Sequence, residues 1–311
     1  MTLPKVVAFG GGHGLAATLK ALKRLTDQLT AVVTVADDGG SSGRLRDEFD
    51  CLPPGDLRMA LAALTGDNPE GRLWADVFQT RFGGEGPLAG HAVGNLLISA
   101  LWQRDPDPVH GLDQVGKLLE AQGRVLPMSS LPLVISADVA GLDHDNPTST
   151  TVVTGQANIA LSEGEVLNIR LTPKNPPACP EAVASILDAD YLVFGPGSWF
   201  TSVVPHLLVP ELVAAILESP AKRICLLNLL PAGETSGFSP SRHIEILAEH
   251  CPELTLNTVI ADPSFAQDPS LSTAVKAMAG QLLIAPVAMH DGSPRHDPFL
   301  VAAILAHVME L

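Results

Sequence analysis

The first strand-like run of this chain ends in a cluster of glycines. Residues 6–9 are apolar, and residues 10–14 then read Gly-Gly-Gly-His-Gly before a helical pattern begins. Glycine lets the backbone approach a ligand closely, and the free N–H groups at a helix start favour an anion. A tight turn needs only one or two glycines. Four in five positions therefore predict phosphate binding at Gly10, Gly11, Gly12, His13 and Gly14.

The next segment extends the pattern of a dinucleotide-binding unit. Residues 12–17 fit G-x-G-x-x-A, and residues 29–36 read as a buried parallel strand that ends at Asp37 and Asp38. An acid about 20 residues after the glycines holds a ribose hydroxyl in such units. Two carboxylates beside phosphates also suit Mg²⁺. Because neighbouring residues of a strand point to opposite sides, we expect one of the two to face the ligand.

The polar residues that follow are predicted to form a second wall of the same site. Residues 37–44 read as a flexible loop that carries the polar side chains of Ser41, Ser42 and Arg44. His91 and Asn95 lie four residues apart at a glycine-bounded helix start, so they share one face. Asp56 precedes another helical run, and an N-cap role and a ligand role both remain open for it.

Two later loops also follow predicted strands. Residues 191–194 lead into a glycine-rich turn that repeats the layout of the first one. A capped turn is the alternative, but we favour a phosphate site made by Gly195, Gly197, Ser198, Thr201 and Ser202. After residues 223–227, we expect ligand contacts from Asn228, Glu234 and Thr235. Arg295, in a loop stiffened by two prolines, is expected to clamp a diphosphate.

The order of elements predicts an α/β fold with a doubly wound, Rossmann-like, mainly parallel sheet. Residues 1–124 and 174–311 are expected to form this nucleotide-binding core. From residue 125 to residue 173 the pattern changes to short strand-like runs, one of them at residues 157–161. Such runs suit a small β-rich insertion or sheet extension. This insertion also offers a surface for the homo-oligomer that we expect.

The charge balance narrows the class of partner. The 311 residues include 19 basic and 34 acidic ones, for a formal net charge of −15, which disfavours nucleic acids and anionic membrane surfaces. No apolar run approaches the length of a membrane span. The four cysteines are far apart and form no Cys-x-x-Cys pair, as in a reduced cytosol. With no signal-peptide pattern at the start, we expect a cytoplasmic protein.

Several of these stretches together resemble one protein family. In chain order they are GGGHGL, VTVADDGGSSGRLR, PPGDLR, GHAVGNLLISAL, GPGSWFTSVVPHLLV, NLLPAGETSGF and RHDP. They resemble the gluconeogenesis-factor family (YvcK-like), which is related to the CofD 2-phospho-L-lactate transferases. The motifs run from Gly10 to Pro298, so the resemblance covers nearly the whole chain.

The resemblance implies a regulator that binds UDP-N-acetylglucosamine, acts through a protein partner, and supports cell shape and wall synthesis on gluconeogenic carbon sources. The alternative is a CofD-like transferase, which moves a phospholactyl group from a nucleotide-activated donor onto a deazaflavin with Mg²⁺. Enzymatic activity therefore stays open at this point. The sugar-nucleotide binders usually carry a tyrosine near the last strands to stack on uracil, whereas here Phe265 is the one aromatic residue between residues 263 and 280.

Overall fold

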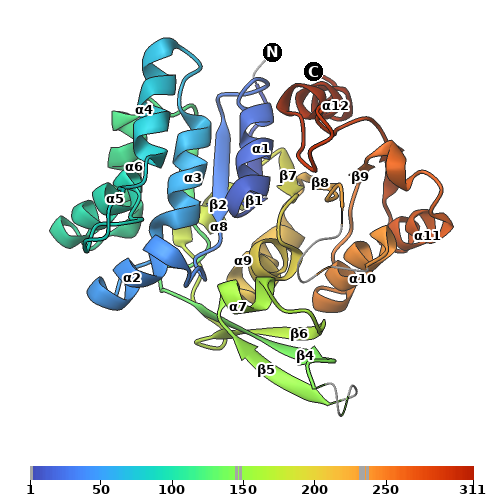
Figure 1. Cartoon of the computed structure of the whole chain (residues 1–311). Coiled ribbons are helices and arrows are strands. Elements are labelled where there is room, and N and C mark those ends of the chain that lie inside the picture. The colour runs from blue at the N-terminus through green and yellow to red at the C-terminus, as the bar shows by residue number, and fades with distance from the viewer. Residues whose placement is uncertain (1–2, 144–145, 147–148, 231–234, 236–237) are drawn as a thin grey trace.

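The computed structural model describes residues 3–143, 146, 149–230, 235 and 238–311 (Figure 1). Within these residues, a seven-stranded sheet runs in the order β10-β9-β8-β7-β1-β2-β3, and all of its pairings are parallel. Its strands are β1 (Val6–Gly10), β2 (Leu29–Val33), β3 (Arg124–Pro127), β7 (Tyr191–Phe194), β8 (Lys222–Leu226), β9 (Thr258–Ala261) and β10 (Gln281–Ile284). The predicted doubly wound α/β fold is confirmed.

The strand order reverses between β1 and β7. From β1 the chain adds β2 and β3 on one side, and it later returns to place β7 against the other side of β1. Phe9 of β1 and Phe194 of β7 are partners in register and stack with ring centroids 4.8 Å apart. Both strands are fully buried, as parallel strands covered on both faces must be. In such sheets, ligands bind at the carboxyl ends of the strands beside this reversal.

Prolines mark the starts of most helices. Eight of the described α-helices have proline in the first turn, where the missing N–H is not needed and the fixed φ suits a helix. They are α3 (Pro54–Leu64), α4 (Pro69–Gln79), α6 (Pro108–Leu118), α8 (Pro180–Leu187), α9 (Pro210–Glu218), α10 (Pro240–His250), α11 (Pro269–Ala277) and α12 (Pro298–Met309). Three further helices are α1 (Gly12–Leu22), α2 (Gly40–Phe49) and α5 (Val93–Arg104). A π-helical turn, η1 (Trp199–Val203), is followed by the 3₁₀ turn η2 (Val204–Leu208).

The predicted β-rich insertion is a separate three-stranded sheet with the order β5-β4-β6. It consists of β4 (Val134–Ala140), β5 (Thr150–Thr154) and β6 (Glu165–Thr172), paired antiparallel. Figure 1 shows it below the main sheet, on the side away from both termini. β3 overlaps the start of the segment assigned to the insertion, but it pairs with β2 in the main sheet.

Two local predictions are wrong. Residues 157–161 do not form a strand, because α7 (Gln156–Ala160) occupies this segment. Residues 37–44 are not all loop either, because α2 starts at Gly40. Leu45 of α2 is buried in the core together with Ser41 and Ser42, so tertiary packing offsets the low helix propensity of a glycine- and serine-rich start.

In the described part of the chain, no single helix is long and apolar enough to cross a membrane, although one sharply bent pair, 199–208 with 210–218, meets that test jointly.

Candidate functional site

The two glycine-rich turns contact each other at the reversal point of the sheet. Gly12, with φ of +58°, opens α1, and Gly14 lies against the turn that follows β7. A Cβ atom on Gly14 would lie 2.2 Å from the carbonyl oxygen of Pro196 and 2.7 Å from Cα of Gly197. Glycine is therefore required at position 14, because any side chain would push the two turns apart.

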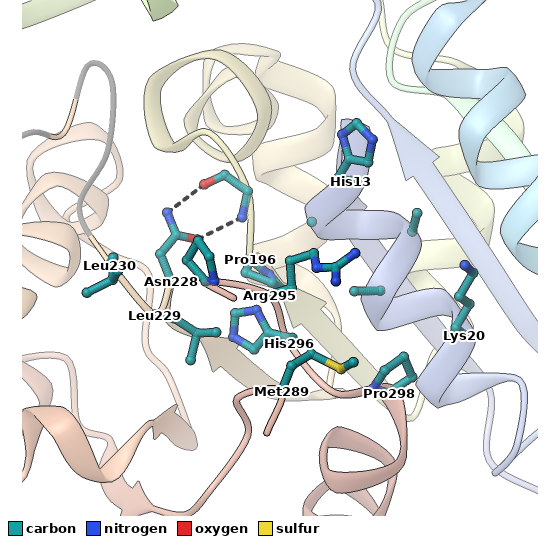
Figure 2. Close-up of a pocket in the computed structure, with 15 residues that line it drawn as sticks. His13, Lys20, Pro196, Asn228, Leu229, Leu230, Met289, Arg295, His296 and Pro298 are labelled. Carbon is teal, nitrogen blue, oxygen red and sulfur yellow. Dashed lines mark hydrogen bonds between the residues drawn. The ribbon is translucent and has the colours of Figure 1, made fainter. Parts of the chain in front are cut away.

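A cleft of about 460 Å³ opens beside this contact (Figure 2). Its walls come from four parts of the chain: one side of α1, the turn after β7, the residues that follow β8, and the segment that leads into α12. The lining side chains and backbone belong to His13, Gly14, Ala16, Ala17, Lys20, Pro196, Gly197, Asn228, Leu229, Leu230, Met289, Pro294, Arg295, His296 and Pro298. The volume suits a nucleotide-sized ligand.

Asn228 fixes the backbone of the second turn. Its side-chain oxygen accepts a hydrogen bond from the Gly197 N–H at 2.9 Å, and its amide nitrogen donates to the Gly197 carbonyl at 2.8 Å. Thr18 of α1 adds a bond from its hydroxyl to the Gly195 carbonyl at 3.1 Å. The turn after β7 is therefore held from α1 on one side and from β8 on the other.

Arg295 lines the cleft with an exposed guanidinium. Its Nε donates to the Ser293 hydroxyl at 3.1 Å, and one terminal nitrogen pairs with the Asp291 carboxylate at 3.2 Å. These contacts orient the side chain, while its remaining donors stay available for a ligand. The neighbouring His296 donates from Nε2 to the Leu227 carbonyl at 3.1 Å. Burial lowers the pKa of His296 to about 4, so the ring is neutral near pH 7.

The two predicted acids have different surroundings. Asp37 is half-buried, and its Oδ1 accepts the Gly39 N–H at 2.9 Å. Asp38 is exposed, and its Oδ1 accepts the Ala157 N–H at 3.1 Å in the first turn of α7. Asp38 thus connects the loop before α2 to the insertion. Asp37 lies against the start of α3, where a Cβ atom on Gly55 would be 2.9 Å from its Oδ2.

Asp56 lies under the first glycine turn. A Cβ atom on Gly11 would be 2.4 Å from its Oδ2, so the carboxyl group packs directly against that glycine. The side chain is buried, and Oδ2 has no hydrogen-bond partner among the described residues. Burial and, second, the charge of Asp37 raise the pKa of Asp56 to about 7, against a smaller lowering by the Gly12 backbone. Asp56 is in the first turn of α3, which Pro53 caps, so the N-cap alternative is wrong.

Three other predicted residues form a buried network with Arg58. Arg58 Nε donates to Asn95 Oδ1 at 2.8 Å, and Asn95 Nδ2 donates to the Ser41 hydroxyl at 2.9 Å. The Ser41 proton is then directed to Nδ1 of His91, 3.0 Å away. Burial lowers the pKa of His91, which fits a neutral ring that accepts this bond. The network joins α2, α3 and α5, and its polar atoms are largely bound to one another.

The remaining predicted residues are outside the cleft wall. Ser42 accepts the Gly55 N–H at 3.0 Å, and Arg44 donates to the Ala89 carbonyl at 2.8 Å. Ser198 bonds to Thr201, which is buried with Ser202 around η1. Thr235 is buried, and Glu234 lies outside the described residues. Sequence reasoning missed Lys20, Met289 and His296 as lining residues. His13, Ala17 and Lys20 are spaced to lie on one face of a helix, so this spacing could have indicated that Lys20 lines the cleft.

Comparisons with known proteins show the family to which the chain belongs. The family model described as 2-phospho-L-lactate transferase CofD matches residues 6–284. The chain belongs to the CofD family. A relative from Mycobacterium tuberculosis (strain ATCC 25618 / H37Rv) is 52% identical over 305 residues, covering 96% of this chain and 89% of the relative. The Bacillus subtilis (strain 168) protein named gluconeogenesis factor is 36% identical over 260 residues, covering 83% of this chain and 78% of that protein.

The fold agrees with a solved structure of this family. The crystal structure of a UPF0052 family protein from Bacillus halodurans matches with a TM-score of 0.85 at 33% identity, over 98% of this chain and 99% of that one. The resemblance to gluconeogenesis factors that the sequence motifs indicate is thereby confirmed, and it extends across both the main sheet and the insertion.

We expect that the contact between the two turns tolerates no side chain at position 14. Gly14→Ala places a methyl group against the Pro196 carbonyl, so it should lower the free energy of unfolding by about 1–3 kcal/mol, as overpacking does. Chemical denaturation measures this change. Gly86→Ala is the matched control, because no atom lies within 4 Å of its added Cβ. Equal stability of the two variants would contradict the contact.

Asp56 gives the ligand-free protein a defined pH dependence. Its pKa is about 7 when folded and 3.8 ordinarily, so between these values the folded chain holds one more proton than the unfolded chain. Its contribution to stability therefore falls as the pH rises from about 4 to about 7. Asp56→Asn should remove this dependence. The free energy of unfolding of the variant, relative to that of the parent, should therefore rise by a few kcal/mol as the pH rises through that range. Denaturation at pH 5 and pH 8 measures the difference, and a constant difference would contradict it.

Proposed function

We propose that this protein binds a nucleotide diphosphate sugar of the UDP-N-acetylglucosamine type in the cleft beside α1. The observation that carries the proposal is the convergence of both glycine turns and Arg295 on one cleft. Backbone N–H groups at the start of α1 and the guanidinium of Arg295 are suitable donors for a diphosphate. The Bacillus subtilis relative is named gluconeogenesis factor, and we prefer a regulator over an enzyme on that ground.

The wider role that we propose follows the gluconeogenesis-factor relatives. On this proposal the protein works in the cytoplasm, acts through a protein partner, and supports cell shape and wall synthesis on gluconeogenic carbon sources. A homo-oligomer is part of the same proposal. The chain has a net charge of −15. This charge favours a small anionic ligand, bound at a local positive site, over an extended polyanion.

A second candidate function is transferase activity of the CofD kind, and the Asp37–Asp56 pair favours it. Asp56 packs against Gly11 of the first glycine turn, and the carboxylate of Asp37 is close enough to raise its pKa. Asp56 Oδ2 has no partner among the described residues. This donor set fits Mg²⁺, which binds one or two carboxylates and completes its shell with phosphates. We propose Asp37 and Asp56 as its ligands in place of Asp37 and Asp38. The ion would neutralise charge between the carboxylates and the ligand's phosphates.

Arg295→Ala should weaken the binding of UDP-N-acetylglucosamine about tenfold, because an exposed charge-assisted hydrogen bond to phosphate is lost. Arg295→Lys should recover part of the loss, since an ammonium keeps the charge without the paired donors. Isothermal titration calorimetry measures both variants, with Arg104→Ala as an exposed arginine control on α5. If Arg295→Ala binds as tightly as the parent, the guanidinium is a surface group only.

The two candidate functions differ in turnover. If the protein is a regulator, it binds UDP-N-acetylglucosamine and transfers no phospholactyl group to a deazaflavin with Mg²⁺ present. The assay follows the deazaflavin product by chromatography, with a nucleotide-activated phospholactate as donor and Asp37→Asn as the control for any activity seen. Product formation that Asp37→Asn abolishes would replace the regulator with the transferase.

A further inference from the structure

The cleft continues along α1 into a second compartment. His13, Ala17, Lys20 and Arg24 follow one another at positions i, i+4, i+7 and i+11, so they lie along one side of the helix and its end. The compartment has a volume of about 350 Å³ and lies between this side of α1, the connection from α3 to α4, and the start of α12. Lys20 and Pro298 line both spaces, so the two spaces adjoin.

The second compartment is positively charged in an otherwise acidic protein. Four of the chain's 19 basic residues line it, against two acidic ones. The basic residues are Lys20, Lys23, Arg24 and Arg72, and the acidic ones are Asp67 and Asp76. With a net charge of −15 over the whole chain, an anion meets a favourable local field at few places.

Only part of this positive charge is compensated internally. Lys23 is buried and donates to the Thr65 carbonyl at 2.7 Å and to Asp67 at 2.8 Å. Arg24 lies 3.4 Å from the same carboxylate and stacks over Phe299, 4.2 Å from the ring centroid. The side chain of Lys20, in contrast, has no hydrogen bond or ion pair with any residue that the structure describes. Its ammonium group is therefore available at the junction of the two compartments.

The two ends of the first cleft differ in chemistry. Figure 2 shows Leu229 and Leu230 on one side, His13 and Lys20 on the other, and Arg295 between them. A flat nucleobase suits the leucine side, where apolar area is buried. With the diphosphate at Arg295, the part of the ligand beyond the diphosphate then points along α1 toward Lys20 and the second compartment.

From this arrangement we propose that the second compartment is an anion subsite, and that the protein prefers a nucleotide diphosphate sugar whose sugar carries a carboxylate or a further phosphate. The proposal rests on the proposed function, because it takes the diphosphate to bind beside Arg295. Lys20 is the residue that contacts the added anionic group, and Arg24 and Arg72 supply the surrounding positive field.

The test compares two probes that differ by one carboxylate: UDP-N-acetylglucosamine and the same sugar nucleotide with C6 oxidised to a carboxylate. The parent protein should bind the uronate about fivefold more tightly in calorimetry at low salt, as an exposed ion pair allows. Lys20→Met should abolish this preference, so that the variant binds the two probes with equal affinity. Lys276→Met, an exposed lysine of α11, is the matched control and should keep the preference.

The outcomes separate the two proposals. If the parent binds both probes equally, or if Lys20→Met keeps the preference, the anion subsite is wrong and the proposed function stands. If neither probe binds, the proposed function fails and the subsite fails with it. Arg295→Ala should weaken both probes to the same extent, since it acts on the diphosphate that they share. Raising the salt concentration should reduce the preference for the uronate, because ions screen an exposed pair.

Discussion

The contact between the N-terminus of α1 and the turn after β7 fixes the rest of the site. It brings together segments nearly 200 residues apart, and it exists only because Gly14 has no side chain to meet Pro196. Thr18 and Asn228 then hold the same turn from opposite sides. The cleft is therefore built on the two central strands of the sheet, which are buried and paired in register. A site carried by such rigid elements keeps its donors in place before a ligand arrives.

Charge is distributed so that an acidic chain can still hold an anion. The acid nearest to the first glycine turn, Asp56, is buried and has its pKa raised to about 7, so it carries less than a full charge under neutral conditions. Arg295 and Lys20 face the cleft, and three more basic residues follow in the adjoining compartment. Because helix N-termini and buried donors act over short distances, local geometry decides anion binding more than net charge does.

Much of the fold could be predicted from the sequence, because parallel strands are short apolar runs that end in turns. The strand at residues 191–194 has the predicted limits. The sequence predictions are wrong where the local conformational preference of a segment and its tertiary packing disagree. The start of α2 is rich in glycine and serine, yet it is helical because Leu45, Ser41 and Ser42 pack into the core. The run at residues 157–161 is too short for periodicity to separate helix from strand.

The site was harder to predict than the fold, because a polar residue's role depends on which partners the tertiary structure gives it. Asp37 and Asp38 are adjacent, yet Asp37 lies against the start of α3 at Gly55, whereas Asp38 accepts a hydrogen bond from the first turn of α7. Ser41, His91 and Asn95 do come together, but they bond to one another, and Asn95 also accepts from a buried arginine of a third helix. Buried polar groups must be satisfied, and the nearest donors do so before any ligand can. Groups that have no partner among the described residues, such as Asp56 Oδ2 and the Lys20 ammonium, are therefore better indicators of ligand contacts than polarity alone.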